Sequence, residues 1–337
     1  MILGPCSAES REQVLLTASQ LKEACGDTPF IFRAGVWKAR TNPHTFQGAG
    51  TQALEWLKEV KATYCLPIAT EVASTEHVEQ AIAAGVDYLW IGARTAANPI
   101  AVQEIADAIK VKGERLKVKG LLVKNPVNAD ADLWLGNIER LEKTGVPVMA
   151  IHRGCNHQPC WAVAHKVRTA RPDIPMLLDP SHMSGDAAQV PALLEKIPEL
   201  GLDGAMIEAH CCPKDALSDN NQQITPLQLG NALHSLSCRY RVVVVSLPSV
   251  PQEELNWLRA EIDELDERLW DTIVARMEVS ERIGKWKKAH DVTPLQPERF
   301  QQIASRAKQM ATQSGLSEDF AQQLIELIHT ESLRRQQ

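Results

Sequence analysis

The chain lacks the features of a membrane, secreted or nucleic-acid-binding protein. None of its apolar runs approaches the roughly 18 residues that a membrane helix needs. A net charge of −6 argues against a nucleic-acid binder. The eight cysteines have no framework spacing and no signal peptide is visible, so we expect reduced thiols in a cytoplasmic protein that binds neither membrane nor nucleic acid.

A glycine-rich dinucleotide fingerprint is also missing, because no Gly-x-Gly-x-x-Gly follows the first apolar run. What the sequence does contain is eight short apolar runs with helical patterns between them, such as those at 10–24, 50–63, 75–84 and 160–171. The runs are 1–3, 30–36, 67–72, 88–93, 120–124, 146–152, 176–179 and 204–208. Eight alternating units in roughly 240 residues predict a (β/α)8 TIM barrel, with a doubly wound open sheet as the alternative.

The composition changes near residue 240, which predicts a barrel domain over 1–240, a linker over 241–251 and an all-α domain over 252–337. Apolar residues such as Leu258, Ile262, Leu265 and Leu269 then follow at steps of three and four, as on one face of a helix. This helix reaches about residue 288, and two more are expected at about 297–314 and 317–335. A first helix of ~57 Å is too long for an ordinary surface helix, so it predicts a homodimer with paired helices.

Four residues of metal-binding type follow predicted strands: Cys6, His182, Glu208 and Asp219. The carboxyl ends of barrel strands converge on one mouth, so these residues can meet around one ion. Each alone is more often a packing or loop residue. Together, their sulfur, nitrogen and oxygen donors suit Mn, Fe, Co or Zn better than Mg or Ca.

Basic residues follow the same strands, namely Arg33, Lys38, Arg40, Arg94, Lys124 and Arg153. Singly, each is expected to be a solvated charge. Converging on a metal site, they would form a positive pocket for carboxylate and phosphate groups. Asp179 and Ser181 are expected to support the metal ligands from behind. Lys124 is the candidate for proton transfer, because a lysine among cations gives up its proton more readily.

These residues lie in runs that resemble 3-deoxy-D-arabino-heptulosonate 7-phosphate (DAHP) synthase over the whole barrel. The runs are Gly4-Pro5-Cys6-Ser7, Arg33 with Lys38-Ala39-Arg40-Thr41, Gly92-Ala93-Arg94, Asp179-Pro180-Ser181-His182, Ile207-Glu208-Ala209-His210 and Leu217-Ser218-Asp219. The resemblance implies the metal-dependent condensation of phosphoenolpyruvate with erythrose 4-phosphate, the first step of the shikimate pathway.

The resemblance also implies roles for single residues. Cys6, His182, Glu208 and Asp219 would bind the metal, with Mn²⁺ expected first. Phosphoenolpyruvate would be held by Arg33, Lys38, Ala93, Arg94, Lys124 and Arg153, of which Lys38 and Lys124 are also taken as catalytic. Arg40 and Thr41 would take the phosphate of erythrose 4-phosphate. Ala39 departs from the family's usual proline and matches the sister octulosonate 8-phosphate synthase, which is the alternative for the barrel.

Three basic residues mark the predicted first helix of the second domain. Arg276 and Lys287 are about three turns apart on one face, ~16 Å between Cα atoms, so their side chains could converge on a small dianion. Arg259 lies roughly 25 Å before Arg276, too far for the same pocket within one chain, but a second copy could supply it. Solvated surface charges are the alternative interpretation.

Residues 252–337 resemble the all-helical chorismate mutase. The resemblance implies a site made of Arg259 from a partner chain, Arg276, Lys287, Arg299, Ser332 and Gln336, with Lys287 and Gln336 stabilising charge on the ether oxygen. Two departures, Phe300 for a site Glu and Gln296 for a site Asp, favour as an alternative a ligand-sensing dimerisation module with little catalysis. A fusion of the two enzymes favours erythrose 4-phosphate, since both activities then serve one pathway. We expect no N-terminal regulatory domain, and feedback by prephenate or chorismate through the helical domain.

Overall fold

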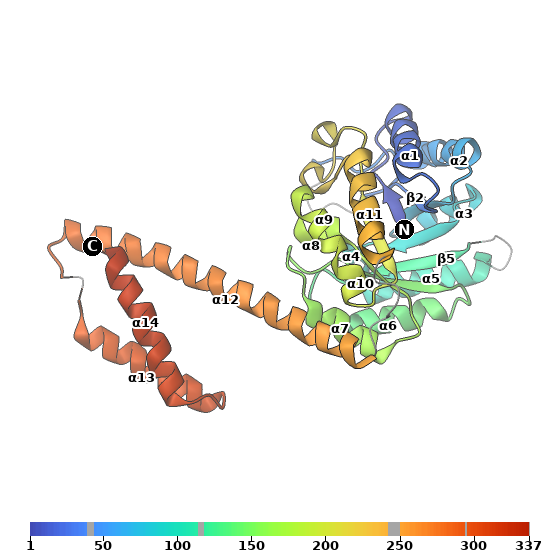
Figure 1. Cartoon of the computed structure of the whole chain (residues 1–337). Helices are drawn as coiled ribbons and strands as arrows, with labels where there is room; N and C mark the ends of the chain where they lie inside the picture. The colour runs from blue at the N-terminus through green and yellow to red at the C-terminus, as the bar shows by residue number, and fades with distance from the viewer. Residues whose placement is uncertain (39–43, 114–117, 242–249, 294, 337) are drawn as a thin grey trace. The chain divides into compact units, whose positions relative to one another are not determined.

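The computed structural model describes residues 1–38, 44–113, 118–241, 250–293 and 295–336 (Figure 1). Its contacts divide the chain into two compact units, Met1–Glu261 and Ile262–Gln337. The predicted linker 241–251 falls mostly outside the described residues, as do Ala39, Arg40 and Thr41.

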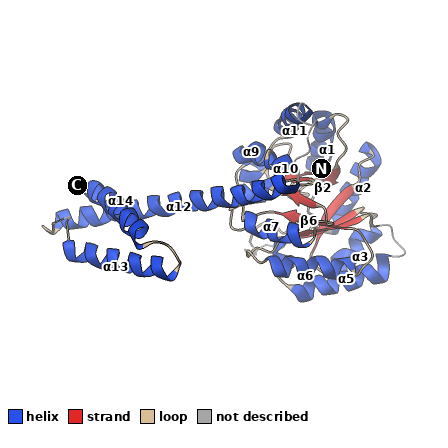
Figure 2. Cartoon of the chain, turned by 60° about the horizontal axis from the view of Figure 1, so that its bottom comes forward, coloured by secondary structure: helices blue, strands red, loops and turns tan. Residues whose placement is uncertain are grey.

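The first unit is a closed parallel barrel, so the prediction of a TIM barrel is confirmed and the open sheet is wrong. Figure 2 shows the strands at the centre with helices around them. In the described residues the strands are β1 (Ile2–Gly4), β2 (Ile31–Arg33), β3 (Ile68–Val72), β4 (Tyr88–Ile91), β5 (Gly120–Lys124), β6 (Val148–His152), β7 (Met176–Leu178) and β8 (Gly204–Glu208). β1 pairs with β8, which sets Gly4 beside Glu208 at the mouth and closes the barrel.

Two apolar cores hold this barrel together. The inner core contains residues from the strands alone, and fills the barrel with Ile2, Ala69, Trp90, Leu122, Ile151, Leu177 and Met206. The outer core joins the other faces of the strands to the surrounding helices. Because the strands are buried on both faces, they appear in the sequence as continuous apolar runs rather than as alternating ones.

Helices follow the strands around the barrel and their positions match the predicted helical patterns. They are α1 (Arg11–Cys25), α2 (Thr51–Tyr64), α3 (Thr75–Ala83), α4 (Ala93–Ala96), α5 (Pro99–Gly113), α6 (Ala131–Glu142), α7 (Trp161–Ala170), α8 (Pro180–Ser184), α9 (Val190–Leu194), α10 (Lys196–Glu199) and α11 (Pro226–Arg241). Short 3₁₀ turns are η1 (Ala187–Gln189), η2 (Pro213–Asp215) and η3 (Asn220–Gln222). Side chains cap several N-termini, and in α8 the Asp179 carboxylate accepts from the His182 backbone N–H.

The first three turns of α12 (Val250–Ala289) belong to the barrel unit and pack on α7. Trp257 is 3 % exposed, and its ring stacks on His165 with centroids 5.5 Å apart. His165 holds two carboxylates of α12, with Nδ1 2.7 Å from Glu261 Oε1 and Nε2 3.2 Å from Glu254 Oε2. The unit that contains the barrel therefore ends at Glu261, inside a continuous helix.

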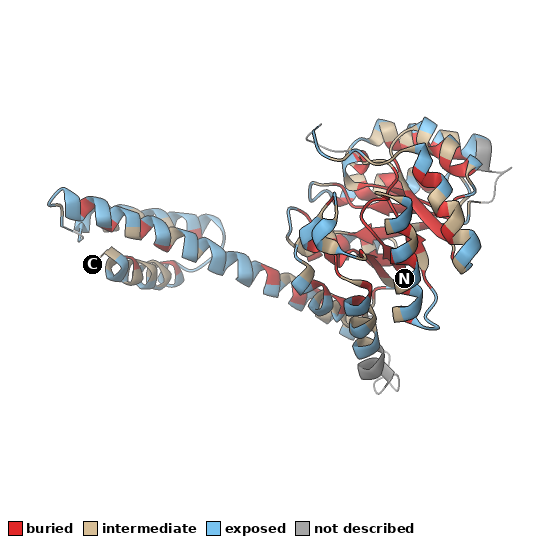
Figure 3. Cartoon of the chain, turned by 90° about the horizontal axis from the view of Figure 1, so that it is seen from above, coloured by how far each residue is buried: buried red, intermediate tan, exposed pale blue. Residues whose placement is uncertain are grey.

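The second unit consists of the rest of α12 with α13 (Pro297–Gln313) and α14 (Glu318–Gln336). These three helices confirm the helical prediction. Figure 3 shows buried residues dense in the barrel and sparse along these helices. Among the described residues, no helix has both the length and the apolar character needed to cross a membrane.

Candidate functional site

Three predicted metal ligands meet where β1 and β8 end. The Cys6 sulfur and carboxylate oxygens of Glu208 and Asp219 all lie within 4.8 Å of one another. The Cys6 Sγ donates to Asp219 Oδ2 at 3.0 Å. Cys6 and Glu208 are fully buried, and Asp219 has a left-handed backbone with φ 48° just before η3. Residues more than 200 positions apart therefore share one cluster, because β1 and β8 are neighbours.

His182, the fourth predicted ligand, stands beside this cluster on α8. Its Nε2 lies 3.6 Å from Glu208 Oε1, and its Nδ1 lies 2.9 Å from Asp179 Oδ2. Asp179 thus fixes the ring from behind and leaves Nε2 facing Glu208, the arrangement in which carboxylates orient metal-binding histidines. Ser181 helps to position Glu208, because its Oγ accepts a hydrogen bond from the Glu208 backbone N–H at 3.0 Å.

The chemistry of the donors fits a divalent first-row metal. Burial, followed by the nearby Glu208 carboxylate, raises the pKa of the Cys6 thiol. Burial also opposes charge on Glu208, but His182 and then Arg33 outweigh it and lower the pKa of that carboxyl. A cation among one sulfur, one imidazole and two carboxylates would favour the thiolate that binds metals. The residues therefore form a possible metal site.

A cavity of about 220 Å³ opens beside the cluster. Five of the residues predicted to bind phosphoenolpyruvate line it: Lys38, Ala93, Arg94, Lys124 and Arg153. His182 and Asp219 line it too, so the structure brings the cations and two of the metal-binding candidates to one space. A cavity with four basic residues suits a small ligand with several negative charges.

Two of the cavity cations, Lys124 and Lys38, are held in place by contacts within the barrel. Lys124 is 4 % exposed, and its Nζ donates to Asp179 Oδ2 at 2.6 Å and lies 3.4 Å from His182 Nδ1. Lys38 Nζ donates to the Cys6 carbonyl at 2.9 Å. Burial lowers the pKa of Lys38, but Cys6, Glu71 and Glu208 outweigh it, so the net pKa is raised. Lys38 is therefore a fixed positive charge.

Arg33 is placed differently from the other predicted cations. It is 1 % exposed and is not among the residues that line the cavity. Its Nη2 donates to Glu208 Oε1 at 3.0 Å, and its guanidinium lies 4.7 Å from the centre of the Trp90 ring. Among the described contacts, Arg33 thus balances the charge of Glu208.

Sequence reasoning missed four cavity residues, Glu71, Val127, His157 and Gln222, of which Glu71 and His157 can carry charge. Glu71 lies near the end of β3, and a Cβ on Gly92 would fall 2.1 Å from its Oε1, so the glycine makes room for this carboxylate. The strand-end rule that found Glu208 could have found Glu71. His157 sits in the loop after β6 with φ 59°, over Gly185. No periodic pattern marks such a loop residue.

The helical unit brings four predicted mutase residues into two pairs. Arg276 on α12 donates to the Ser332 hydroxyl on α14, and Lys287 Nζ donates to Gln336 Oε1 at 3.1 Å. α12 and α14 approach closely at Gly284 of α12, because a Cβ at this position would come within 2.6 Å of the Gln336 Cα. Burial lowers the pKa of Arg276.

The remaining predicted mutase residues are not joined to these pairs by a described contact. Arg299 on α13 donates to Gln302 of its own helix at 3.2 Å. Arg259 is exposed and belongs to the barrel unit, so its place beside a second copy stays a prediction. Of the two departures, Gln296 is the N-cap of α13, and the Phe300 ring stacks on His329 of α14.

Two family models match the chain. Residues 1–237 match the model described as DAHP synthetase I family, and residues 258–337 match the model described as chorismate mutase type II. In the first region, a "Phospho-2-dehydro-3-deoxyheptonate aldolase" of Thermotoga maritima is 28% identical over 231 residues, which is 66% of this chain and 64% of that protein. A "2-dehydro-3-deoxyphosphooctonate aldolase" of Wolinella succinogenes is 25% identical over 260 residues, 70% of this chain and 97% of that protein.

In the second region, a "4-amino-4-deoxychorismate mutase" of Streptomyces venezuelae is 41% identical over 83 residues, which is 25% of this chain and 81% of that protein. Among solved structures, a DAHP synthase of Thermotoga maritima matches with a TM-score of 0.62 and 25% identity, covering 72% of this chain and 69% of that one.

Proposed function

Because the chain belongs to the DAHP synthetase I family and ends in a chorismate mutase type II region, both of which are families of enzymes, we propose that it is a bifunctional enzyme of aromatic biosynthesis. In this proposal the barrel condenses phosphoenolpyruvate with erythrose 4-phosphate to DAHP and phosphate. The observation that carries it is the cluster of Cys6, Glu208 and Asp219 beside a cavity lined by four basic residues.

The cavity residues have defined tasks in this reaction. Lys38, Arg94 and Arg153 hold the phosphate and carboxylate of phosphoenolpyruvate, which positions its methylene carbon for attack on the aldehyde. Lys124 Nζ is the proposed site of proton transfer, since it lines the cavity and is fixed by Asp179. Arg33 keeps Glu208 ionised from outside the cavity. Arg40 and Thr41 remain the proposed phosphate site for erythrose 4-phosphate.

We assign the metal to Cys6, His182, Glu208 and Asp219, with Mn²⁺ first and Co²⁺, Fe²⁺ or Zn²⁺ as alternatives. When bound, such an ion supplies a Lewis acid for the aldehyde oxygen. Support comes from the mixed sulfur, nitrogen and oxygen donors and from the carboxylate that orients His182.

The first test is consumption of phosphoenolpyruvate by the full-length protein with erythrose 4-phosphate, with and without EDTA. We expect consumption that EDTA stops and added Mn²⁺ restores. The octulosonate aldolase reaction is the second candidate, favoured by Ala39 and by relatives such as the Wolinella protein. Arabinose 5-phosphate in place of erythrose 4-phosphate separates the two, because only the true aldose supports rapid consumption.

For the helical domain, residues 252–337 in our sequence-based boundary, we propose the rearrangement of chorismate to prephenate. Arg276 and Arg299, with Arg259 from a second copy, would clamp the carboxylates. Lys287 and Gln336 would stabilise the charge that grows on the ether oxygen, and Ser332 completes the site. Such preorganised charges are enough for a rearrangement that needs no nucleophile. The alternative, a sensor with little catalysis, is favoured by Phe300 and Gln296. Chorismate binding without turnover would identify the sensor.

We also propose that prephenate or chorismate bound to the helical domain inhibits the barrel. The test compares inhibition of the barrel reaction by prephenate in the full-length protein and in Arg276→Ala. Inhibition should be lost in this variant and kept in the control Arg282→Ala, an exposed arginine of the same helix. Equal inhibition of all three proteins would reject this feedback site.

A homodimer through the helices completes the proposal. Ile262, Leu265, Leu269 and Trp270 on α12 are 50–65 % exposed, and a second copy of this helix would bury them. Sedimentation of the full-length protein measures this directly. The cytoplasmic location rests on the cysteine content, and five of the cysteines, Cys6, Cys25, Cys65, Cys211 and Cys212, are free thiols.

A further inference from the structure

His329 stands next to the proposed mutase residues although no sequence argument singled it out. It lies on α14 three residues before Ser332 and seven before Gln336, and this spacing puts all three on one face of the helix. Ser332 and Gln336 use that face to accept from Arg276 and Lys287. His329 therefore extends the same row by one turn.

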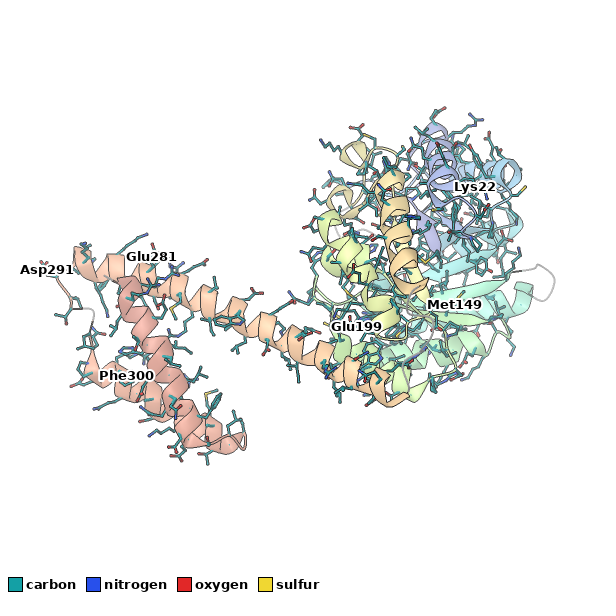
Figure 4. The ribbon with its side chains drawn as sticks, in the orientation of Figure 1. Lys22, Met149, Glu199, Glu281, Asp291 and Phe300 are labelled. Carbon is teal, nitrogen blue, oxygen red and sulfur yellow. The ribbon has the colours of Figure 1, made fainter. Side chains whose placement is uncertain are left out.

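The ring of His329 stacks on Phe300 of α13, with centroids 4.3 Å apart and planes 29° apart. Figure 4 labels Phe300 on that helix. Both side chains are half-buried. The resemblance to chorismate mutase implies a glutamate at this position, and the phenyl ring of Phe300 supplies no hydrogen-bond acceptor there. The His329 imidazole packs on the Phe300 ring and brings its two nitrogen atoms close to that position.

The charges around His329 favour its neutral form. Burial lowers its pKa, and the cations of Arg276 and Lys287 on α12 lower it further. On α13 the ring meets Phe300, and the neighbouring Arg299 is bonded to Gln302. A neutral imidazole offers one donor and one acceptor nitrogen.

The carboxylates on the helix of His329 have other partners. Glu326 accepts from the Gln322 amide, and Glu331 from the guanidinium groups of Arg334 and Arg335. In the described contacts, Glu326 and Glu331 thus pair with residues other than His329.

We propose that His329 is a further ligand-binding residue of the helical unit, whose ring nitrogen accepts a hydrogen bond from the hydroxyl of a dicarboxylate ring alcohol. The inference rests on the proposed mutase function, because Arg276 then holds a carboxylate and Lys287 the ether oxygen of the same ligand. Phe300 fixes the imidazole by stacking, and His329 supplies the acceptor that Phe300 does not.

Full-length protein with His329→Leu and His329→Gln tests the assignment, with His290→Leu, an exposed histidine of the same unit, as the control. His329→Leu should lower kcat/KM for chorismate roughly 10-fold, the effect of one lost neutral hydrogen bond. His329→Gln should recover most of this, and so should Phe300→Glu added to His329→Leu. An unchanged kcat/KM in His329→Leu would overturn the proposal, as would a loss that neither variant recovers.

The pH profile adds a readout that a packing role would not change. Wild-type kcat/KM should fall as the pH drops through the lowered pKa of His329, below 6.5, because the protonated ring cannot accept. This acidic limb should be absent from His329→Gln. A rise in kcat/KM at low pH would mean that the imidazolium acts as a charge, and would overturn the proposal.

Calorimetric binding of chorismate separates this inference from the proposed mutase activity. Wild-type protein that binds chorismate without turning it over would reject the mutase, while a roughly 10-fold weaker Kd in His329→Leu would still support the inference. An equal Kd for chorismate in wild type and His329→Leu overturns the inference. A wild type that does not bind chorismate overturns it as well. Should His329→Leu unfold, His329→Gln and the pH profile decide.

Discussion

The barrel and the helical unit differ in how far each buries its own side chains. In the barrel, two pairs of site charges are buried and neutralise each other, Arg33 with Glu208 and Lys124 with Asp179, both nearly inaccessible to solvent. In the helical unit, large apolar side chains such as Trp270 are more than half exposed. The barrel thus pairs and buries charges of its candidate site within one chain, whereas the helical unit leaves apolar side chains exposed that the proposed dimer would bury.

Removal of a metal-ligand candidate should produce the largest difference between the two units. His182→Ala should lower the barrel reaction by roughly 10³-fold, the several kcal/mol that a Lewis acid contributes, and leave chorismate turnover unchanged. Rates of both reactions on the same preparation check this. Equal losses in both activities would show that the two sites are not separate.

A smaller effect is expected from Asp179→Asn. This change leaves Lys124 buried without its partner charge, which should lower the free energy of unfolding of the barrel by about 3–5 kcal/mol. It should also weaken metal binding roughly 10- to 100-fold, since His182 loses its support. Denaturant unfolding and metal titration measure the two effects. The exposed Asp173→Asn is the control and should change neither.

Acid should weaken the barrel through His152. Burial lowers the pKa of this histidine to about 4, and its Nε2 lies 2.6 Å from the Pro159 carbonyl. Because the ordinary pKa is near 6.5, the stabilisation is complete above pH 6.5 and is lost as the pH falls toward 4, by about 3 kcal/mol. The unfolding free energy of the barrel against pH should be flatter over this window in His152→Asn. Identical slopes in both proteins would contradict the assignment.

The smallest expected effect concerns the proposed dimer of the helical unit. Leu269 is 50 % exposed on α12, and Leu269→Ala should raise the dissociation constant of the proposed dimer roughly 10- to 100-fold, through lost apolar burial. Leu227→Ala on α11 of the barrel, 69 % exposed, should leave it unchanged. Sedimentation at a series of concentrations measures both. A monomeric wild type would end the dimer proposal.

The strands and the metal-binding candidates could be predicted because both depend on local sequence. Continuous apolar runs mark strands buried on two faces, and Cys6 and Glu208 stand where such runs end. Arg33 also follows this rule, yet its guanidinium turns to Glu208 and Trp90 rather than to the cavity. Which neighbour a buried side chain contacts depends on packing between strands, and spacing along the chain does not contain that information.

The helical site shows the same limit. Arg276 and Lys287 could be predicted to share a face because a helix has a fixed period. Their partners Ser332 and Gln336 came only from the resemblance, and His329 was missed, since a single histidine on a helix has no pattern of its own. Its stacking on Phe300 depends on how α13 meets α14.

The first three turns of α12 have an evolutionary consequence. Residues 258–261 belong to the mutase family by sequence and to the barrel unit by packing. Within these four positions, Ala260 and Glu261 face the barrel, and Arg259 is the residue assigned to a neighbouring mutase site. Under the two proposed functions, a mutation there would be tested by selection on both reactions at once. This short segment would then vary less than in either enzyme alone, and exchange of the mutase domain between relatives would have to preserve it.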